Sequence, residues 1–376
     1  MRSTNFQHID EINEGLSNYS TDTAPGKSKI TYSILRWLHK ASLDLIVSLF
    51  AGIMRTGHHP SVLKNANVVI IPKPNKPNYA IPKAYCPIAL LECLSKLLER
   101  VISKRLNHYA IQYDLISNTQ FGGRPNSSVD DATISLVHDI QSAWNQNLKM
   151  SVLFFDISGY FNNIHHQQLL YKLRRKRIPE QIVRWLGSFL TGRTVQIVVD
   201  DNISQTMNIN NSGIPQGSPL SPTLSTYYTA DLLEMFIGGK VILPKYSPDP
   251  VEVTMYVDNG SIRVVSSSLL LNCLSLQTIY LRVHHWTLQN NLTLDSDKRE
   301  LIHFDNTRRR RDDRRCYVTL PNESSLIRSY SKLLWTSSET LVLSPKIARF
   351  KSSGPNPALP RSHPPSGVSS TSLVVL

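Results

Sequence analysis

Two aspartates stand at the ends of predicted strands that lie far apart in the sequence. Asp156 follows the unbroken apolar run 150–155, which is typical of a strand buried on both faces. Asp258 lies between the β-rich segments 251–257 and 261–265, where Asn259-Gly260 favours a tight turn. If the two strands are neighbours, both carboxylates project from one end of a sheet. Such a pair could hold two divalent cations about 3.5–4 Å apart, a clamp for in-line displacement at phosphorus.

An isolated aspartate at a strand end is more often a local turn residue, so the surrounding elements matter. Apolar residues at three- and four-residue spacing predict helices, and short β-branched runs predict strands. The predicted helices cover 28–54, 88–110, 128–145, 166–176, a segment from Pro179 at the first helical position to Gly192, and 223–236. The remaining predicted strands are 66–71 and 195–199, and 213–222 is a Gly/Pro/Ser-rich loop.

Three segments in this order resemble successive palm motifs of reverse transcriptases: FFDISGYF at 154–161, GIPQGSPLSP at 213–222 and YVDNG at 256–260. The resemblance is strongest to the non-long-terminal-repeat, LINE-like retrotransposons, and we expect the fungal type. Segments 82–106 and 120–124 are similar to the fingers and the block that follows, 286–304 to the closing palm motif, and 24–26 to an N-terminal extension. The ten-residue match at 213–222 is specific, whereas YVDNG alone is weak.

This resemblance implies an α+β, right-hand polymerase fold with an antiparallel palm sheet backed by helices, α-rich fingers and a thumb that is missing or rudimentary. We expect an N-terminal helical extension at 1–60, fingers with the first palm elements at 61–150, and the palm at 151–305. A basic, then Ser/Pro-rich, disordered tail is expected at 306–376. The implied activity is RNA-directed DNA polymerase, with an RNA template, a DNA primer and deoxynucleoside triphosphates as partners.

The same resemblance implies roles for individual residues. Asp156 and Asp258 would bind two Mg²⁺ ions, with Mn²⁺ as an alternative, beside Asn259 in the catalytic hairpin. Lys298 is the candidate general acid for the leaving group. The nucleotide-binding candidates are Lys73 for the triphosphate, Phe161 as the gate under the sugar, and Gln216 with Gly217 at the nucleotide. Core packing remains an alternative for Phe161, as does a solvated side chain for either lysine.

The sequence departs from the family pattern at several positions. Asn259 replaces the second hairpin aspartate, which weakens the site for a hard cation. Cys86 stands where an arginine usually contacts the triphosphate. The other departures are Ser95 for glycine, Ser158 for lysine and Asn162 for aspartate. Because four of the five changes can arise by single transitions, we hypothesise a degenerate, truncated copy; an excess of transversions relative to close copies of the gene would contradict this.

Two alternatives stay open beside an active polymerase. One is a catalytically dead remnant that at most binds nucleic acid through the basic runs 172–177 and 308–315. On their own, these runs are more simply a solvated helix face and a disordered tail. The other is an intron-maturase-like reverse transcriptase, although no dedicated RNA-binding domain is recognisable after the palm.

The net charge gives little support for nucleic-acid binding by the predicted polymerase domain. The chain has 41 Lys+Arg and 28 Asp+Glu, a net charge of +13, but 306–376 holds 12 and 4, leaving a net of only +5 for 1–305. The four cysteines form no C-x-x-C pair, His-His pairs lack companions for zinc, and no signal peptide or transmembrane helix is expected. We therefore expect an intracellular protein without a membrane partner, with the nucleus favoured by class over mitochondrion or cytoplasm.

Overall fold

The computed structural model describes residues 9–305 except 18–19, 21–22, 76, 200–201, 210 and 238–250, together with residue 318 and three two-residue strands further on. The predicted basic run 308–315 and most of the predicted disordered tail therefore lie outside the described residues. The tail segments that are described are β11 (Ser329–Tyr330), β12 (Leu334–Trp335) and β13 (Leu341–Val342).

Helices form the N-terminal part of the molecule. The expected extension at 1–60 contains α1 (Ile9–Ser17), α2 (Tyr32–Ala41) and α3 (Leu43–Thr56), and α1 contacts α4 (Cys93–Gln112). The pattern over 28–54 predicted helix, and the structure divides it into α2 and α3 at Ser42. No single described helix is long and apolar enough to cross a membrane; 32–41 and 44–56 meet that test only together, across a bend of 105°.

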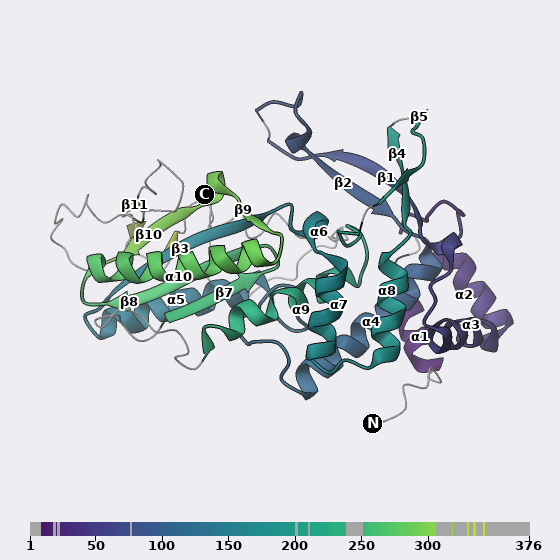
Figure 1. The fold of residues 1–376 in the computed structure, drawn as a ribbon, viewed down its shortest axis with the longest axis horizontal. Helices are drawn as coiled ribbons and strands as arrows, with labels where there is room; N and C mark the ends of the chain where they lie inside the picture. Colours follow the sequence, from purple (N-terminus) through teal and green to yellow (C-terminus); the bar gives the residue numbers. More distant parts are fainter. Residues whose placement is uncertain are drawn as a thin grey trace, which may run out of the picture.

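One sheet rises above the helices at the N-terminal end of the molecule (Figure 1). It contains β1 (Asn65–Pro72), β2 (Tyr85–Leu90), β4 (Thr194–Val199), β5 (Asn202–Ile203) and β6 (Met207–Asn208). Strand β1 pairs antiparallel with β2 and parallel with β4. Since β4, β5 and β6 come from the segment expected to be palm, residues 151–305 contribute to both sheets.

The second sheet has the order β11-β10-β3-β8-β7, with β9 also paired to β3. Its main strands are β3 (Lys149–Ser158), β7 (Val251–Tyr256), β8 (Asn259–Ser266), β9 (Thr293–Leu294) and β10 (Glu300–Phe304). Its pairings are antiparallel except for β10 with β11. Helices α5 (Val129–Asn145) and α10 (Leu269–Gln289) cover opposite faces, as Figure 1 shows.

Side chains of β3 alternate between these two faces. Met150 and Val152 join Leu136 and Ile140 of α5 in one apolar cluster. Leu153, Phe155 and Ile157 join the main core, which includes residues of α10. Asp156 is an even number of residues from Met150 and Val152, so its side chain lies on the same face of the sheet as α5, at the end of the strand.

Four further helices lie between the two sheets: α6 (Tyr160–Asn163), α7 (His166–Arg175), α8 (Glu180–Leu190) and α9 (Ser221–Glu234) (Figure 1). The predicted position of Pro179 was wrong by one residue, because Pro179 is the N-cap of α8 and not its first helical residue. Short 3₁₀ turns at η1 (Ser61–Leu63), η2 (Pro82–Ala84) and η4 (Ser296–Lys298) complete the described elements.

Candidate active site

The two aspartates meet at one end of the second sheet. Strands β3 and β8 are antiparallel neighbours in which Asp156 lies opposite Asn259, the residue after Asp258. The Ile157 N–H donates to the Asp258 carbonyl at 2.9 Å. The hypothesis that the two strands are neighbours is therefore confirmed. The predicted end of the first strand at Asp156 was wrong, because β9 pairs with Ile157 and Ser158 and extends β3 to residue 158.

The hairpin that carries Asp258 turns at a different place from the predicted one. Tyr256 pairs with Asn259, so Val257 and Asp258 are the turn residues, and Val257 has a φ of +60°. The predicted Asn259-Gly260 turn is wrong, since both residues belong to β8. Gly260 is required for another reason: a Cβ there would lie 2.1 Å from the Phe155 ring, which crosses its backbone. Asp258 nevertheless lies at the hairpin tip, as predicted.

Residues 119–122, which overlap the block expected after the fingers, support this hairpin from its outer edge. The Phe121 N–H donates to the Met255 carbonyl at 2.9 Å, and the Met255 N–H donates to Thr119 at 3.0 Å. The buried Gln120 side chain also donates to the Gly122 carbonyl. The glycine pair at 122–123 was the available signal, because paired glycines in a motif often mark a close backbone approach.

Lys298 reaches Asp156 through a short chain of local contacts. The Asp295 N–H donates to the Asp156 carbonyl at 2.8 Å, and the Asp295 side chain caps the 3₁₀ turn that ends at Lys298. The Lys298 ammonium then contacts both carboxylate oxygens of Asp156 at 2.9 Å. Burial raises the pKa of Asp156, and Lys298 opposes that shift. Burial lowers the pKa of Lys298, but its bond to Asp156 and the nearby carboxylates outweigh this and raise it.

Asp258 lies in an environment that disfavours its negative charge. Burial, followed by the negative charge of Asp156, raises its pKa to about 6. The side-chain amide of Asn259 donates to Asp258 Oδ1 at 3.1 Å. Two carboxylates that repel each other supply the oxygen ligands that a hard cation prefers, and Lys298 now neutralises one of them. No third Asp, Glu, His or Cys side chain joins them as a ligand group among the described residues. Asn259 contributes an N–H donor where a third carboxylate would have contributed charge.

The nucleotide-binding candidates on the loop before α9 lie next to Phe161 and strand β2. Phe161 is half-buried against the main core, and its carbonyl accepts from the Ile214 N–H at 2.7 Å. The Gln216 carbonyl accepts from the Ala89 N–H at 2.9 Å. Gly217 has a φ of +117°, and a Cβ there would lie 2.6 Å from the Ala89 carbonyl oxygen. Both sterics and backbone conformation therefore require glycine at 217.

Lys73 and Cys86 occupy the β1–β2 hairpin. The exposed Lys73 directly follows β1, as predicted, and its N–H donates to the Ala84 carbonyl at 2.8 Å. Cys86 pairs with Ile71, two residues before Lys73, and its Sγ accepts from Gln216 Nε2 at 3.5 Å. The β1–β2 hairpin that carries Lys73 therefore contacts Gln216 through Cys86.

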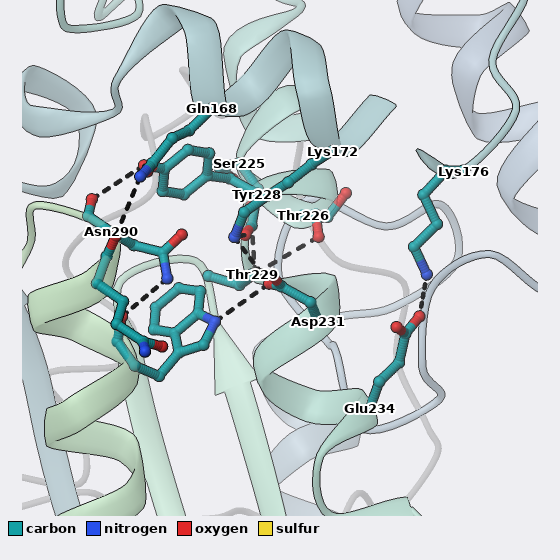
Figure 2. A network of polar contacts seen from close by, with 12 residues as sticks. Gln168, Lys172, Lys176, Ser225, Thr226, Tyr228, Thr229, Asp231, Glu234 and Asn290 are labelled. Carbon is teal, nitrogen blue, oxygen red and sulfur yellow. Dashed lines mark hydrogen bonds and ion pairs between the residues drawn. The ribbon is translucent and has the colours of Figure 1, made fainter. Parts of the chain in front are cut away.

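The two lysines of the basic run 172–177 do not belong to an exposed face, whereas Arg174, Arg175 and Arg177 are exposed. Lys172 is largely buried, and its ammonium donates to Asp231 at 2.8 Å and to the Tyr228 carbonyl at 2.7 Å. It also lies 4.5 Å and 4.7 Å from the ring centroids of Tyr228 and Trp286. Figure 2 shows this network between α7, α9 and α10, with Lys176 paired to Glu234 beside it. Both earlier interpretations, a nucleic-acid face and a solvated face, were wrong for these two lysines.

Replacing Lys172 with methionine should therefore destabilise the fold. The substitution keeps most of the side-chain volume but leaves Asp231 without its cation, so we expect a loss of about 2–4 kcal/mol in the free energy of unfolding. Urea denaturation measures it, and Arg175→Ala, in the exposed part of the same run, is the matched control with a change below about 0.5 kcal/mol. Equal losses for both variants would contradict the buried ion pair.

Paired strands that bring two carboxylates to one sheet end are consistent with the two-metal sites of phosphoryl-transferring enzymes. The family model for reverse transcriptase (RNA-dependent DNA polymerase) matches residues 71–339. The chain therefore belongs to the reverse transcriptase family, and its mixed α/β fold with sheets is consistent with the palm and fingers of that family.

Curated relatives narrow the type of reverse transcriptase. The chain is 29% identical over 246 residues to a probable RNA-directed DNA polymerase from transposon BS of Drosophila melanogaster, covering 64% of this chain and 27% of that protein. It is 27% identical over 298 residues to the RNA-directed DNA polymerase from mobile element jockey of Drosophila funebris, covering 79% and 32%. A third relative, from transposon X-element of Drosophila melanogaster, is 29% identical and covers 64% and 26%.

These relatives confirm the LINE-like assignment, and the chain spans about a quarter to a third of their length. All three are from Drosophila, so they give no support to the expected fungal type.

Proposed function

We propose that this chain catalyses the RNA-templated addition of deoxynucleotides to the 3′-hydroxyl of a DNA primer. The observation that carries the proposal is the pairing of β3 with β8, which brings Asp156 and Asp258 to one sheet end. Support also comes from loop 213–217, which is fixed to Phe161 and Ala89 by backbone hydrogen bonds. Carboxylates and an open, glycine-containing loop suit a triphosphate substrate bound with divalent metal.

Asp156 and Asp258 are the residues that would hold Mg²⁺, or Mn²⁺ in its place. When bound, the metal supplies charge neutralisation at the triphosphate and lowers the pKa of the attacking hydroxyl. Lys298 holds its proton firmly while it contacts Asp156, so its proposed role as general acid requires it to leave that carboxylate for the leaving group. Gln216 and Gly217 line the nucleotide, Phe161 lies under its sugar, and Lys73 approaches from the β1–β2 hairpin.

The division into fingers at 61–150 and palm at 151–305 belongs to this proposal, and the reduced thumb stays a prediction. The proposed partners are an RNA template, a DNA primer and deoxynucleoside triphosphates, without a membrane. The nucleus is the proposed location, since integration takes place there. Binding of the hybrid through its backbone and shape should weaken as salt concentration rises.

Primer extension on poly(rA)/oligo(dT) with Mg²⁺ or Mn²⁺ tests the activity. Asp156→Ala removes a proposed metal ligand, so we expect at least a ~10³-fold loss of incorporation relative to the unmodified chain. Asp297→Ala, an exposed carboxylate on the neighbouring turn, is the control and should keep its activity. If the unmodified chain incorporates no more than Asp156→Ala, the enzyme proposal fails for this chain.

A second candidate function is a catalytically inactive member of the family. The observation that favours it is the Asn259 amide, which donates to the Asp258 carboxylate where the family pattern has a second aspartate. Nucleic-acid binding through 172–177 would have to rest on its exposed arginines, because Lys172 and Lys176 contact Asp231 and Glu234. Primer extension with the unmodified chain separates the two candidates.

A further inference from the structure

A buried group of polar side chains lies beneath loop 213–221, and the proposed reaction does not use it. Glu99, on α4, is fully buried. One of its carboxylate oxygens accepts from the Ser95 hydroxyl at 2.6 Å, and the other accepts from the Ser218 hydroxyl. Ser95 lies one turn earlier on the same helix, whereas Ser218 belongs to the loop. A single carboxylate therefore connects the helix to the loop.

A carboxylate in this position is unfavourable unless its hydrogen bonds are made. Burial raises the pKa of Glu99, and the hydroxyls of Ser218 and Ser95 oppose that shift. An apolar residue would fill this position on the buried face of α4 without such a requirement. The sequence signal was available: Glu99 stands between Leu98 and Val101 on a predicted helix, where the pattern favours an apolar residue.

Ser218 also forms hydrogen bonds with other residues of the loop. Its N–H donates to the Pro215 carbonyl at 3.1 Å, and its hydroxyl oxygen accepts from the Leu220 N–H at 3.1 Å. The residues between, Gln216 and Gly217, are exposed. They are held on their other side by β2, where the Ala89 N–H donates to the Gln216 carbonyl. Helix α4 and strand β2 thus fix the loop from two directions.

We propose that Glu99 is a positioning residue, which holds Ser218 and thereby sets Gln216 and Gly217 in place for the incoming deoxynucleoside triphosphate. The proposal rests on the nucleotide role of Gln216 and Gly217 proposed above. Glu99 itself does not touch the nucleotide. Its effect should therefore fall on nucleotide affinity, since a displaced contact weakens binding without removing a reacting group.

The two serines on one carboxylate provide a matched pair of variants. Ser218→Ala breaks the link between Glu99 and the loop, together with the bond from the Leu220 N–H. Ser95→Ala removes a similar hydrogen bond to Glu99 within α4, together with a contact to His59 Nε2 at 3.3 Å, and leaves the loop's own bonds in place. Hydrogen exchange of the full chain measures how often the loop amides open, and this measurement does not require catalysis. We expect Ser218→Ala to raise the exchange rate of amides 213–221 at least ~10-fold and Ser95→Ala to change it less than about 2-fold. Equal changes would mean a general packing role and would overturn the proposal.

The second measurement compares the change in KM for deoxynucleotide with the change in kcat. Each variant is made in a protein that also carries Asn259→Asp. Ser218→Ala and Glu99→Ala should raise the KM about 10-fold with kcat changed less than about 3-fold, and Glu99→Gln should recover most of the loss. An unchanged KM for Ser218→Ala would also overturn the proposal. If the background incorporates no nucleotide, the proposed function fails, while hydrogen exchange still decides whether Glu99 holds the loop.

Discussion

Asn259→Asp should raise the affinity of the site for Mg²⁺ by about 10-fold or more and should increase primer extension in proportion. The Asn259 amide now donates to Asp258 Oδ1 and so occupies an oxygen that a cation would use. A carboxylate at 259 removes that donor and adds a negative charge beside Asp258. The affinity of carboxylate sites for hard cations rises with the number of charged ligands. A tenfold change corresponds to about 1.4 kcal/mol of binding free energy.

The same substitution should change stability in opposite directions with and without metal. In EDTA the new charge adds to the repulsion that already raises the pKa of Asp258, so the melting temperature should fall. In millimolar Mg²⁺ it should rise above that of the unmodified protein, because ligand binding stabilises the folded state. Asn208→Asp, which adds a charge at an exposed position of the other sheet, is the control. If the melting temperature of Asn259→Asp did not change on addition of Mg²⁺, the proposed metal site would be contradicted.

The sequence predicted the meeting of Asp156 and Asp258 because both follow strong β-strand signals within an ordered set of motifs. The turn between β7 and β8 could not be predicted in the same way. Asn259-Gly260 has the local preference for a turn, whereas Val257, which is β-branched, disfavours its positive φ. The pairing of β8 with β3 and the Phe155 ring over Gly260 decide the register instead. Tertiary contacts override local preference at this hairpin.

The two lysines of the run 172–177 were predicted wrongly for a similar reason. A dense basic sequence is typical of an exposed helix face, and nothing local marks Lys172 as different from Arg175. Its partners Asp231 and Trp286 are distant in sequence and lie on α9 and α10. Glu99 and Ser218 show the same limitation, because a helix and a loop far apart in sequence form one hydrogen-bonded group. Motif order located the two candidate catalytic aspartates, whereas the buried contacts of Lys172 and Glu99 become visible only in three dimensions.

Asp258→Asn should make the metal-free protein more stable while abolishing primer extension by at least ~10³-fold. Burial and the charge of Asp156 raise the pKa of Asp258 from its ordinary value of 3.8 to about 6. The folded state therefore holds this proton more tightly than the unfolded state. Stability contributed by the protonated group is complete below about pH 4 and is lost as pH rises through about 6.

At pH 7.5 in EDTA, Asp258→Asn should gain about 1–3 kcal/mol in the free energy of unfolding, since each pKa unit is worth ~1.4 kcal/mol. The gain should disappear at pH 4, where the wild-type carboxyl is protonated as well. Urea denaturation at both pH values measures it, with the exposed Asp297→Asn as control. Addition of Mg²⁺ should stabilise the wild-type protein and leave Asp258→Asn unchanged. A variant that is less stable than wild type at pH 7.5 would show that the two carboxylates do not repel each other, and the case for a cation between them would lose its electrostatic basis.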